Sequence, residues 1–239
     1  GNSPIILNNE YGEFIDSHDV VIRLNDASTD KKHRGEKTDV VYIDGSGRRI
    51  ETIISKIDSY FVFSYPSHIW FFERMHQTLN FLKDNKLNFD IVDGSFYDEL
   101  STQLNSKRSL FDEKRNIRPN TGTVALFHTI ALGAKKMYVS GIDFYAGSYE
   151  PSHVWGSKSN EEVKRILDGG DGPDVHHPEI QLTLFKELYN KNKDRISLYE
   201  SIEENHNKRQ SSNVKLEEKK IGEDLEIKNK KQNKFDLFG

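Results

Sequence analysis

Short runs of β-branched and aromatic residues alternate with longer amphipathic segments between residues 19 and 200, and this alternation constrains the fold more than any other feature. Each short run ends in residues that favour turns, as strands commonly do. The predicted strands span residues 19–26, 38–45, 59–66, 89–94, 136–144 and 196–200. Because strands that alternate with helices usually form a parallel sheet, we predict an α/β fold with a Rossmann-like parallel sheet flanked by helices.

The intervening segments carry apolar residues at helical spacing. This spacing predicts helices over 72–85 (Met75, Leu79, Leu82), 121–132 (Val124, Phe127, Ala131) and 178–192 (Ile180, Leu184, Leu188). Gly133 stands where a helix commonly ends in a glycine. Residues 96–115 are highly charged, and we interpret them as helix and loop.

The domain organisation follows from length and composition. The chain has 239 residues, enough for one α/β core with a small appendage. We predict a single domain over 1–204 and a charged tail over 205–239. The tail has few apolar residues to bury, so we expect it to be disordered or marginally helical. The chain opens on Gly-Asn-Ser-Pro, a turn that normally follows a buried strand, and we expect that the first strand of the domain is missing.

Composition excludes several classes of function. The chain has no cysteine, which excludes disulfides, thiolate metal sites and thiol catalysis. Its net charge of −4 gives no reason to expect nucleic-acid binding. No apolar run reaches the ~18 residues that span a membrane, and no signal peptide is visible. We expect a cytoplasmic protein, which the slightly basic tail could attach to the inner face of a membrane. The oligomeric state is left open.

Polar residues gather where predicted strands end and helices begin, which is where parallel sheets bind ligands. The amides of Asn2 and Asn25 offer both a donor and an acceptor, as recognition of a nucleobase or ribose requires, although each also suits an ordinary turn or cap. Asn120, Thr121 and Gly122 open a predicted helix. Free backbone N–H groups there favour a phosphate or carboxylate, and Asn120 or Thr121 could also serve as a plain N-cap.

Four more residues could carry chemistry. Tyr145 and Tyr149 follow a strand end and could hydrogen-bond a phosphate, or be ordinary aromatics. His176 and His177 follow a run of aspartates over 168–174. They could be metal ligands, a buried structural pair or a general base. Adjacent side chains diverge and rarely bind one ion, and the glycines of the run indicate a flexible loop, so we expect no metal site.

Two segments carry a resemblance to a known family. Residues 8–28, "NNEYGEFIDSHDVVIRLNDAS", resemble the large sialylmotif of eukaryotic sialyltransferases. Residues 118–145, "RPNTGTVALFHTIALGAKKMYVSGIDFY", resemble the small sialylmotif, and are more similar still to the matching segment of bacterial lipo-oligosaccharide sialyltransferases. The similarity covers roughly 1–44 and 118–199. It implies a single-domain, GT-A-like glycosyltransferase that uses CMP-sialic acid and a glycan acceptor and needs no metal or cofactor, in lipo-oligosaccharide or capsule biosynthesis.

The resemblance also assigns roles. It implies donor-binding positions in the turn after the first strand, at the end of the second strand, at the start of the 121–132 helix and after the 136–144 strand: Asn2, Ser3, Asn25, Arg118, Asn120, Thr121, Gly122, Ser140, Gly141 and Asp143. It implies that Tyr145 and Tyr149 bind the departing phosphate. The base is a histidine five residues before an acidic or polar residue, and His176 with Gln181 fits this spacing better than the neighbouring His177.

The sequence departs from the family in three places. The eukaryotic enzymes join their motifs by a disulfide, which a chain without cysteine cannot form. Asp44 stands where the bacterial enzymes carry an asparagine, and its charge would repel a phosphate. The spacing of Tyr145 and Tyr149 is shorter than in the bacterial enzymes. A CMP-Kdo-dependent transferase and a non-catalytic nucleotide- or sugar-binding module are the alternatives, and the acceptor and linkage are not determined.

Overall fold

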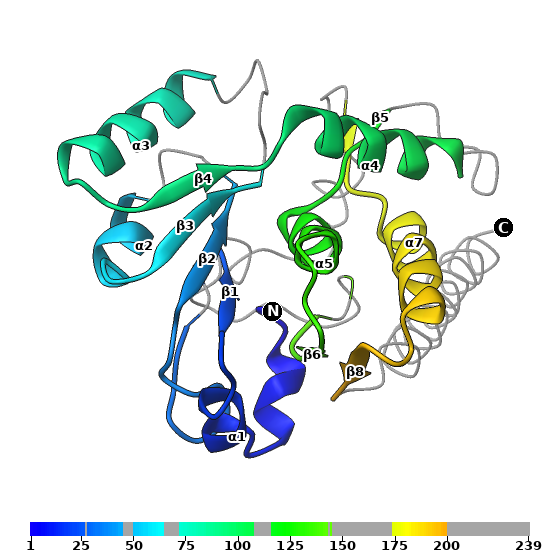
Figure 1. The fold of residues 1–239 in the computed structure, drawn as a ribbon, viewed down its shortest axis with the longest axis horizontal. Helices are drawn as coiled ribbons and strands as arrows, with labels where there is room; N and C mark the ends of the chain where they lie inside the picture. Colours follow the sequence, from blue (N-terminus) through cyan, green and yellow to red (C-terminus); the bar gives the residue numbers. More distant parts are fainter. Residues whose placement is uncertain are drawn as a thin grey trace, which may run out of the picture.

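A four-stranded parallel sheet forms one half of the molecule (Figure 1). The computed structural model describes residues 1–26, 28–44, 50–64, 72–107, 116–142, 144 and 174–199. The strands follow one another in chain order: β1 (Ile22–Leu24), β2 (Val40–Ile43), β3 (Tyr60–Phe63) and β4 (Phe89–Ile91). Each lies parallel to its neighbour. The predicted α/β class, the parallel sheet and these four strands are confirmed.

Four further strands form two parallel pairs. β6 (Met137–Val139) pairs with β8 (Ile196–Leu198), and both strands were predicted. β5 (Asn116–Ile117) pairs with β7 (Asp174–Val175). Neither member of this second pair was predicted, because two residues are too few to show a strand pattern.

The helices cover the strands. α3 (Phe72–Asp84), α5 (Thr121–Ala131) and α7 (Pro178–Lys191) confirm the three predicted helices, and α4 (Gly94–Ser106) is the helical part of the charged segment. Gly133 follows α5 with φ +89°, and its N–H donates to the Ile130 carbonyl, as expected of a glycine after a helix. The sequence did not predict the short elements η1 (Pro4–Asn8), α1 (Gly12–Asp16) and α2 (Ile50–Ser55).

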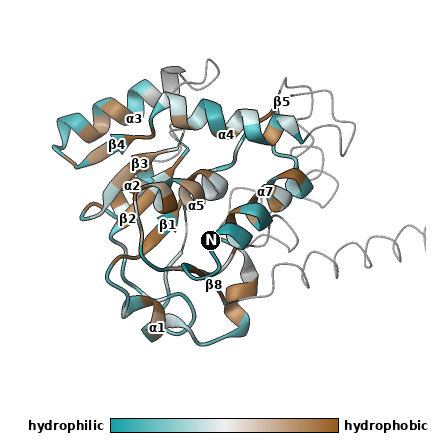
Figure 2. Cartoon of the chain, turned by 45° about the vertical axis from the view of Figure 1, so that its right-hand side comes forward, coloured by the Kyte–Doolittle hydropathy of each residue, from teal (hydrophilic) through white to brown (hydrophobic). Residues whose placement is uncertain are grey.

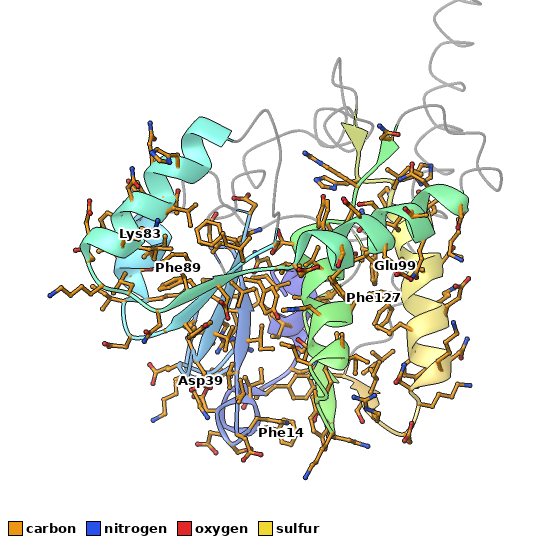
Figure 3. The ribbon with its side chains drawn as sticks, turned by 45° about the horizontal axis from the view of Figure 1, so that its top comes forward. Phe14, Asp39, Lys83, Phe89, Glu99 and Phe127 are labelled. Carbon is orange, nitrogen blue, oxygen red and sulfur yellow. The ribbon has the colours of Figure 1, made fainter. Side chains whose placement is uncertain are left out.

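Helix α5 lies between the four-stranded sheet and α7, as Figure 1 shows. Its residues Val124 and Ala125 pack in one apolar cluster with Tyr42 of β2 and Ile180 of α7. Phe127 contacts this cluster and a second cluster around Phe185 of α7, and it lies between the two helices in Figure 3. The strands and the inward side of α5 are largely apolar, whereas α3 and α4 show hydrophilic residues outward (Figure 2). The first turns of α5 are therefore packed against both the sheet and α7.

The remaining expectations concern the ends of the chain. The tail over 205–239 lies outside the described residues, and so does the end of the predicted 1–204 domain. Within the described ranges, no helix has the length and apolar character needed to cross a bilayer.

Candidate active site

The N-terminus of α5 is capped by one side chain and leaves two backbone N–H groups open. Asn120 is the cap, since its Oδ1 accepts from the Thr123 N–H at 2.8 Å and its carbonyl accepts from the Val124 N–H at 3.0 Å. In the described part of the chain, the N–H groups of Thr121 and Gly122 meet no acceptor. Such groups, with the positive end of the helix dipole, favour an anion. The capping and anion-site interpretations therefore both apply to this turn.

Gly122, in the first turn of α5, leaves little room for a side chain. A Cβ added to Gly122 would lie 3.3 Å from Asn120 Oδ1 and 3.5 Å from a methyl carbon of Leu24. The first distance is shorter than an ordinary van der Waals contact, and Asn120 Oδ1 is the atom that caps the helix, so a side chain at this position would press on the cap.

Asn25 joins three elements at the carboxyl end of β1. Its backbone is left-handed (φ 48°), its N–H donates to the carbonyl of Tyr42 of β2 at 2.7 Å, and its Oδ1 accepts from the Asp44 N–H at 3.1 Å. Its Nδ2 lies 3.5 Å from Thr121 Oγ1 at the start of α5. The side chain therefore holds the ends of β1 and β2 against α5, and one Nδ2 hydrogen remains beyond these contacts.

The turn at Asn2 lies between the carboxyl ends of β1 and β6. Asn2 Nδ2 donates to the carbonyl of Leu24 at 3.1 Å, and the Ser3 N–H donates to the carbonyl of Gly141 at 3.0 Å. The Gly1 amino group donates to the carbonyl of Ser140 at 2.7 Å. Gly141 has φ +64°, a conformation that favours glycine. Four predicted donor-binding residues, Asn2, Ser3, Ser140 and Gly141, are thus brought together.

The side chains of Asn2 and Ser3 differ in their hydrogen bonding. Asn2 Oδ1 is buried and finds no hydrogen-bond donor among the residues that the structure describes. A buried acceptor without a donor costs about 1–3 kcal/mol, so this atom is suited to receive a hydrogen bond from a ligand. Ser3 caps η1, because its Oγ accepts from the Ile5 N–H at 3.4 Å. Its contribution is therefore at least partly structural.

His176 lies beside Arg118. Arg118 follows β5 and His176 follows β7, and the parallel register of Ile117 with Val175 brings the two strand ends together. His176 Nδ1 lies 3.2 Å from the Arg118 carbonyl oxygen. Because a carbonyl only accepts, Nδ1 carries the hydrogen and Nε2 is the unprotonated nitrogen of the neutral ring.

His177 has a different environment. It is the residue before α7, and its Nδ1 lies 3.1 Å from Glu179 Oε2. Its side chain is therefore directed to its own helix, while that of His176 is directed to the strand end at Arg118.

Gln181 is the residue whose importance the sequence did not show. Its side chain is completely buried, and it contacts Asn120, Thr123 and the carbonyl of Arg118. A signal was present, because Gln181 occupies the same helical stripe as Leu184 and Phe185, and an amide on an apolar stripe needs polar partners. In the sequence, Gln181 served only to mark the spacing from the histidine.

Three predicted residues, Asp143, Tyr145 and Tyr149, and most of the 168–174 aspartate run lie outside the described residues. Among the residues that the structure describes, no three His, Asp or Glu side chains gather as metal ligands would. Asp44 lies at the carboxyl end of β2, where its N–H donates to Asn25.

Comparison with known proteins identifies the family. The profile of glycosyltransferase family 29 (sialyltransferase) matches residues 1–135, more than half of the chain. The chain belongs to glycosyltransferase family 29. The predicted relation to sialyltransferases is thereby confirmed at the level of the family. The fold of the family 29 chain is similar to that of a mammalian sialyltransferase crystal structure, with a TM-score of 0.52 and 16% identity over 83% of this chain and 66% of that chain.

Two further relatives are named for the transfer of different sugars. The sialyltransferase CstII from Campylobacter jejuni, in complex with the substrate analogue CMP-3FNeuAc, gives a TM-score of 0.49 and 18% identity over 83% of the family 29 chain and 79% of its own. The β-1,6-galactosyltransferase GALT29A from Arabidopsis thaliana is 46% identical over 48 residues, which are 19% of the family 29 chain. The family 29 chain spans only 12% of that plant protein and 66% of the mammalian structure.

Proposed function

We propose that the chain transfers sialic acid from CMP-sialic acid to a hydroxyl of a glycan, with inversion and without a metal ion. One observation supports the proposal: His176 contacts the carbonyl of Arg118, and Asn120, two residues later, caps the N-terminus of α5. A base and an anion site thus lie at one strand end, as transfer from a charged donor requires.

His176 supplies the base. The hydrogen bond of its Nδ1 to Arg118 leaves Nε2 to take the proton of the acceptor hydroxyl. The acceptor oxygen forms a bond to the anomeric carbon of sialic acid as the bond from that carbon to the phosphate oxygen breaks. The electron pair leaves with CMP. A single displacement of this kind inverts the configuration at the anomeric carbon.

The donor side uses hydrogen bonds. The N–H groups of Thr121 and Gly122 would hold the carboxylate or phosphate of the donor. Asn2 Oδ1 needs a hydrogen-bond donor, and the cytosine amine and the ribose hydroxyls are suitable groups. Tyr145 and Tyr149 remain our prediction for the departing phosphate, and Ser140, Gly141 and Asp143 for the cytidine. Because CMP carries one phosphate and is a good leaving group, these contacts can replace a metal.

A second candidate is a galactosyltransferase that uses UDP-galactose. The observation in its favour is the match to the Arabidopsis protein named a β-1,6-galactosyltransferase. A CMP-Kdo-dependent transferase and a non-catalytic nucleotide- or sugar-binding module are two further candidates. The base at His176 favours an enzyme, since binding alone needs no base.

The test is a donor screen. The protein is incubated with CMP-sialic acid, CMP-Kdo or UDP-galactose, with lactose or Gal-β-1,3-GalNAc as acceptor, and both released nucleotide and glycan product are measured. The second acceptor is the disaccharide bound in a mammalian sialyltransferase structure of the same fold. We expect sialylated product only with CMP-sialic acid, and the same rate in EDTA. Product from another donor refutes the proposed donor. Loss of activity in EDTA that Mg²⁺ or Mn²⁺ restores refutes the metal-free mechanism.

We also expect a cytoplasmic location and attachment to a membrane surface through the tail. Peripheral attachment to a membrane would depend on residues 205–239, and sedimentation with vesicles of anionic lipid, compared with a chain ending at residue 204, would measure it. The location in the cytoplasm stays a prediction.

A further inference from the structure

We propose that Gln181 is a positioning residue that holds the donor-binding start of α5 and the base His176 in one fixed arrangement. Gln181 touches neither substrate in the proposed reaction. The inference rests on the proposed function for its effect on turnover, but its structural part can be measured without turnover.

The amide of Gln181 satisfies three backbone and side-chain groups. Its Oε1 accepts from the Asn120 N–H at 3.0 Å and from the Thr123 hydroxyl at 2.5 Å. Its Nε2 donates to the carbonyl of Arg118 at 3.3 Å. The chemistry fixes this orientation of the amide, because an N–H faces one end and a carbonyl faces the other. The side chain is 0% exposed, so water cannot replace these partners.

The contacts of Gln181 Oε1 fix the first turn of α5, where we propose the anion site. Asn120 is the N-cap of α5, and its side chain accepts from the N–H of Thr123, two residues after Thr121. Gln181 binds the backbone of the same Asn120 and the hydroxyl of the same Thr123. The position of Gln181 therefore sets the turn from which the N–H groups of Thr121 and Gly122 point.

The contact of Gln181 Nε2 with the Arg118 carbonyl fixes the hydrogen-bond partner of the base His176. The carbonyl oxygen of Arg118 receives both Gln181 Nε2 and His176 Nδ1. By holding this peptide, Gln181 presents the acceptor that keeps the hydrogen on Nδ1 and leaves Nε2 unprotonated. The donor site and the base are thus joined through one amide group on α7.

Only a group with both an acceptor and a donor can make these contacts. A glutamate in the same place keeps the acceptor for Asn120 and Thr123. When ionised it loses the donor, and a carboxylate oxygen then faces the Arg118 carbonyl. When protonated it regains an O–H donor. Burial disfavours the ionised form of a carboxyl group, so the change between these states should fall at higher pH than for an exposed glutamate.

The experiment compares Gln181→Glu with the parent chain from about pH 5.5 to about pH 9, a range that spans the titration of histidine. In the parent, turnover of CMP-sialic acid should rise with pH, as catalysis by a general base requires. In Gln181→Glu, turnover should rise and then fall, and should be lower on the order of tenfold or more at the alkaline end, because the ionised carboxylate displaces the Arg118 carbonyl. The matched control is Gln77→Glu, the same chemical change at an exposed position of α3, which should keep the parent profile.

A second measurement is independent of turnover. The ¹⁵N shifts of the His176 ring report its tautomer, and circular dichroism reports folding. In folded Gln181→Glu, we expect the Nδ1–H tautomer to be lost as the carboxyl ionises, together with weaker CMP binding. An unchanged pH profile, or an unchanged tautomer and CMP affinity in the folded variant, overturns the inference. If the parent chain itself turns over no CMP-sialic acid, the proposed function fails, while the tautomer measurement still decides whether Gln181 positions the His176 ring.

Discussion

His176 Nδ1 lies 3.2 Å from the carbonyl oxygen of Arg118, a residue 58 positions earlier in the chain. The environment of the adjacent His177 is different, because its Nδ1 lies 3.1 Å from Glu179 Oε2 in the first turn of α7. A carbonyl partner on Nδ1 leaves Nε2 as the basic nitrogen.

Replacing His176 by alanine should therefore lower the rate of sialyl transfer by about 10²–10⁴-fold, the usual contribution of a general base. The affinity for CMP should change little, because the ring is proposed to act on the acceptor. Turnover measured with saturating CMP-sialic acid, and CMP binding by calorimetry, check the two parts. His177→Ala should lose far less activity, and the opposite ranking of the two variants would make His177 the base.

Gly122→Ala should weaken donor binding and change stability little. Alanine is favoured over glycine in a helix by about 0.8–1 kcal/mol, but its Cβ would press on the capping oxygen of Asn120, and the two effects oppose each other. The same methyl group would lie 3.3 Å from Asn120 Oδ1, beside the N–H groups of the anion site, and should raise KM for the donor. Denaturant unfolding and the donor dependence of the rate are the measurements. A folded variant with an unchanged KM would show that the donor does not approach this turn.

Tyr42 should make stability depend on pH in the alkaline range. Burial raises the pKa of Tyr42 from 10.0 to about 12. Its hydroxyl lies 2.8 Å from His128 Nδ1, and burial lowers the pKa of His128. Because the pKa of Tyr42 is higher in the folded chain, its stabilisation is complete below about pH 10 and is lost as the pH rises from about 10 to about 12. The loss amounts to roughly 2–3 kcal/mol.

The comparison that isolates this effect is Tyr42→Phe. At neutral pH the variant should be about 1 kcal/mol less stable, since it lacks the hydrogen bond to His128. Above about pH 10 the parent should lose this advantage. Urea unfolding of both chains from about pH 7 to about pH 11.5 measures the difference, and a difference that stays constant over that range would contradict the raised pKa.

Arg23 should prove structural, although it belongs to the resembling Arg-x-Asn segment. It is 7% exposed, burial lowers the pKa of its guanidinium, and it donates to the carbonyls of Lys37 and Gly35. Arg23→Met leaves these carbonyls without this donor and should destabilise the chain by about 2–4 kcal/mol. Lys83→Met, at an exposed position of α3 labelled in Figure 3, is the matched control and should change stability little. Equal stability of the two variants would refute this role.

Much of the fold could be predicted because its signals are local. Each strand of β1 to β4 shows a short β-branched or aromatic run, and α5 and α7 show an apolar residue at every third or fourth position. The start of α5 was predicted from four consecutive residues, and the family from two continuous segments. The strands β5 and β7 were not predicted, because a strand of two residues shows no periodicity and each of these strands forms only by pairing with the other.

The sequence by itself determined the α/β class, the main strands and helices, the capped start of α5 and the relation to sialyltransferases. Only the tertiary structure decided that His176 rather than His177 meets Arg118, that Asn25 uses its side-chain oxygen on the Asp44 backbone, and that Gln181 is buried between Arg118 and Asn120. The physical reason is the distance along the chain between the residues in contact. Periodicity and turn chemistry act over a few neighbouring residues, whereas these contacts join residues 19 to 63 positions apart. The pairing of β1 with β2, the pairing of β5 with β7 and the packing of α7 bring them together.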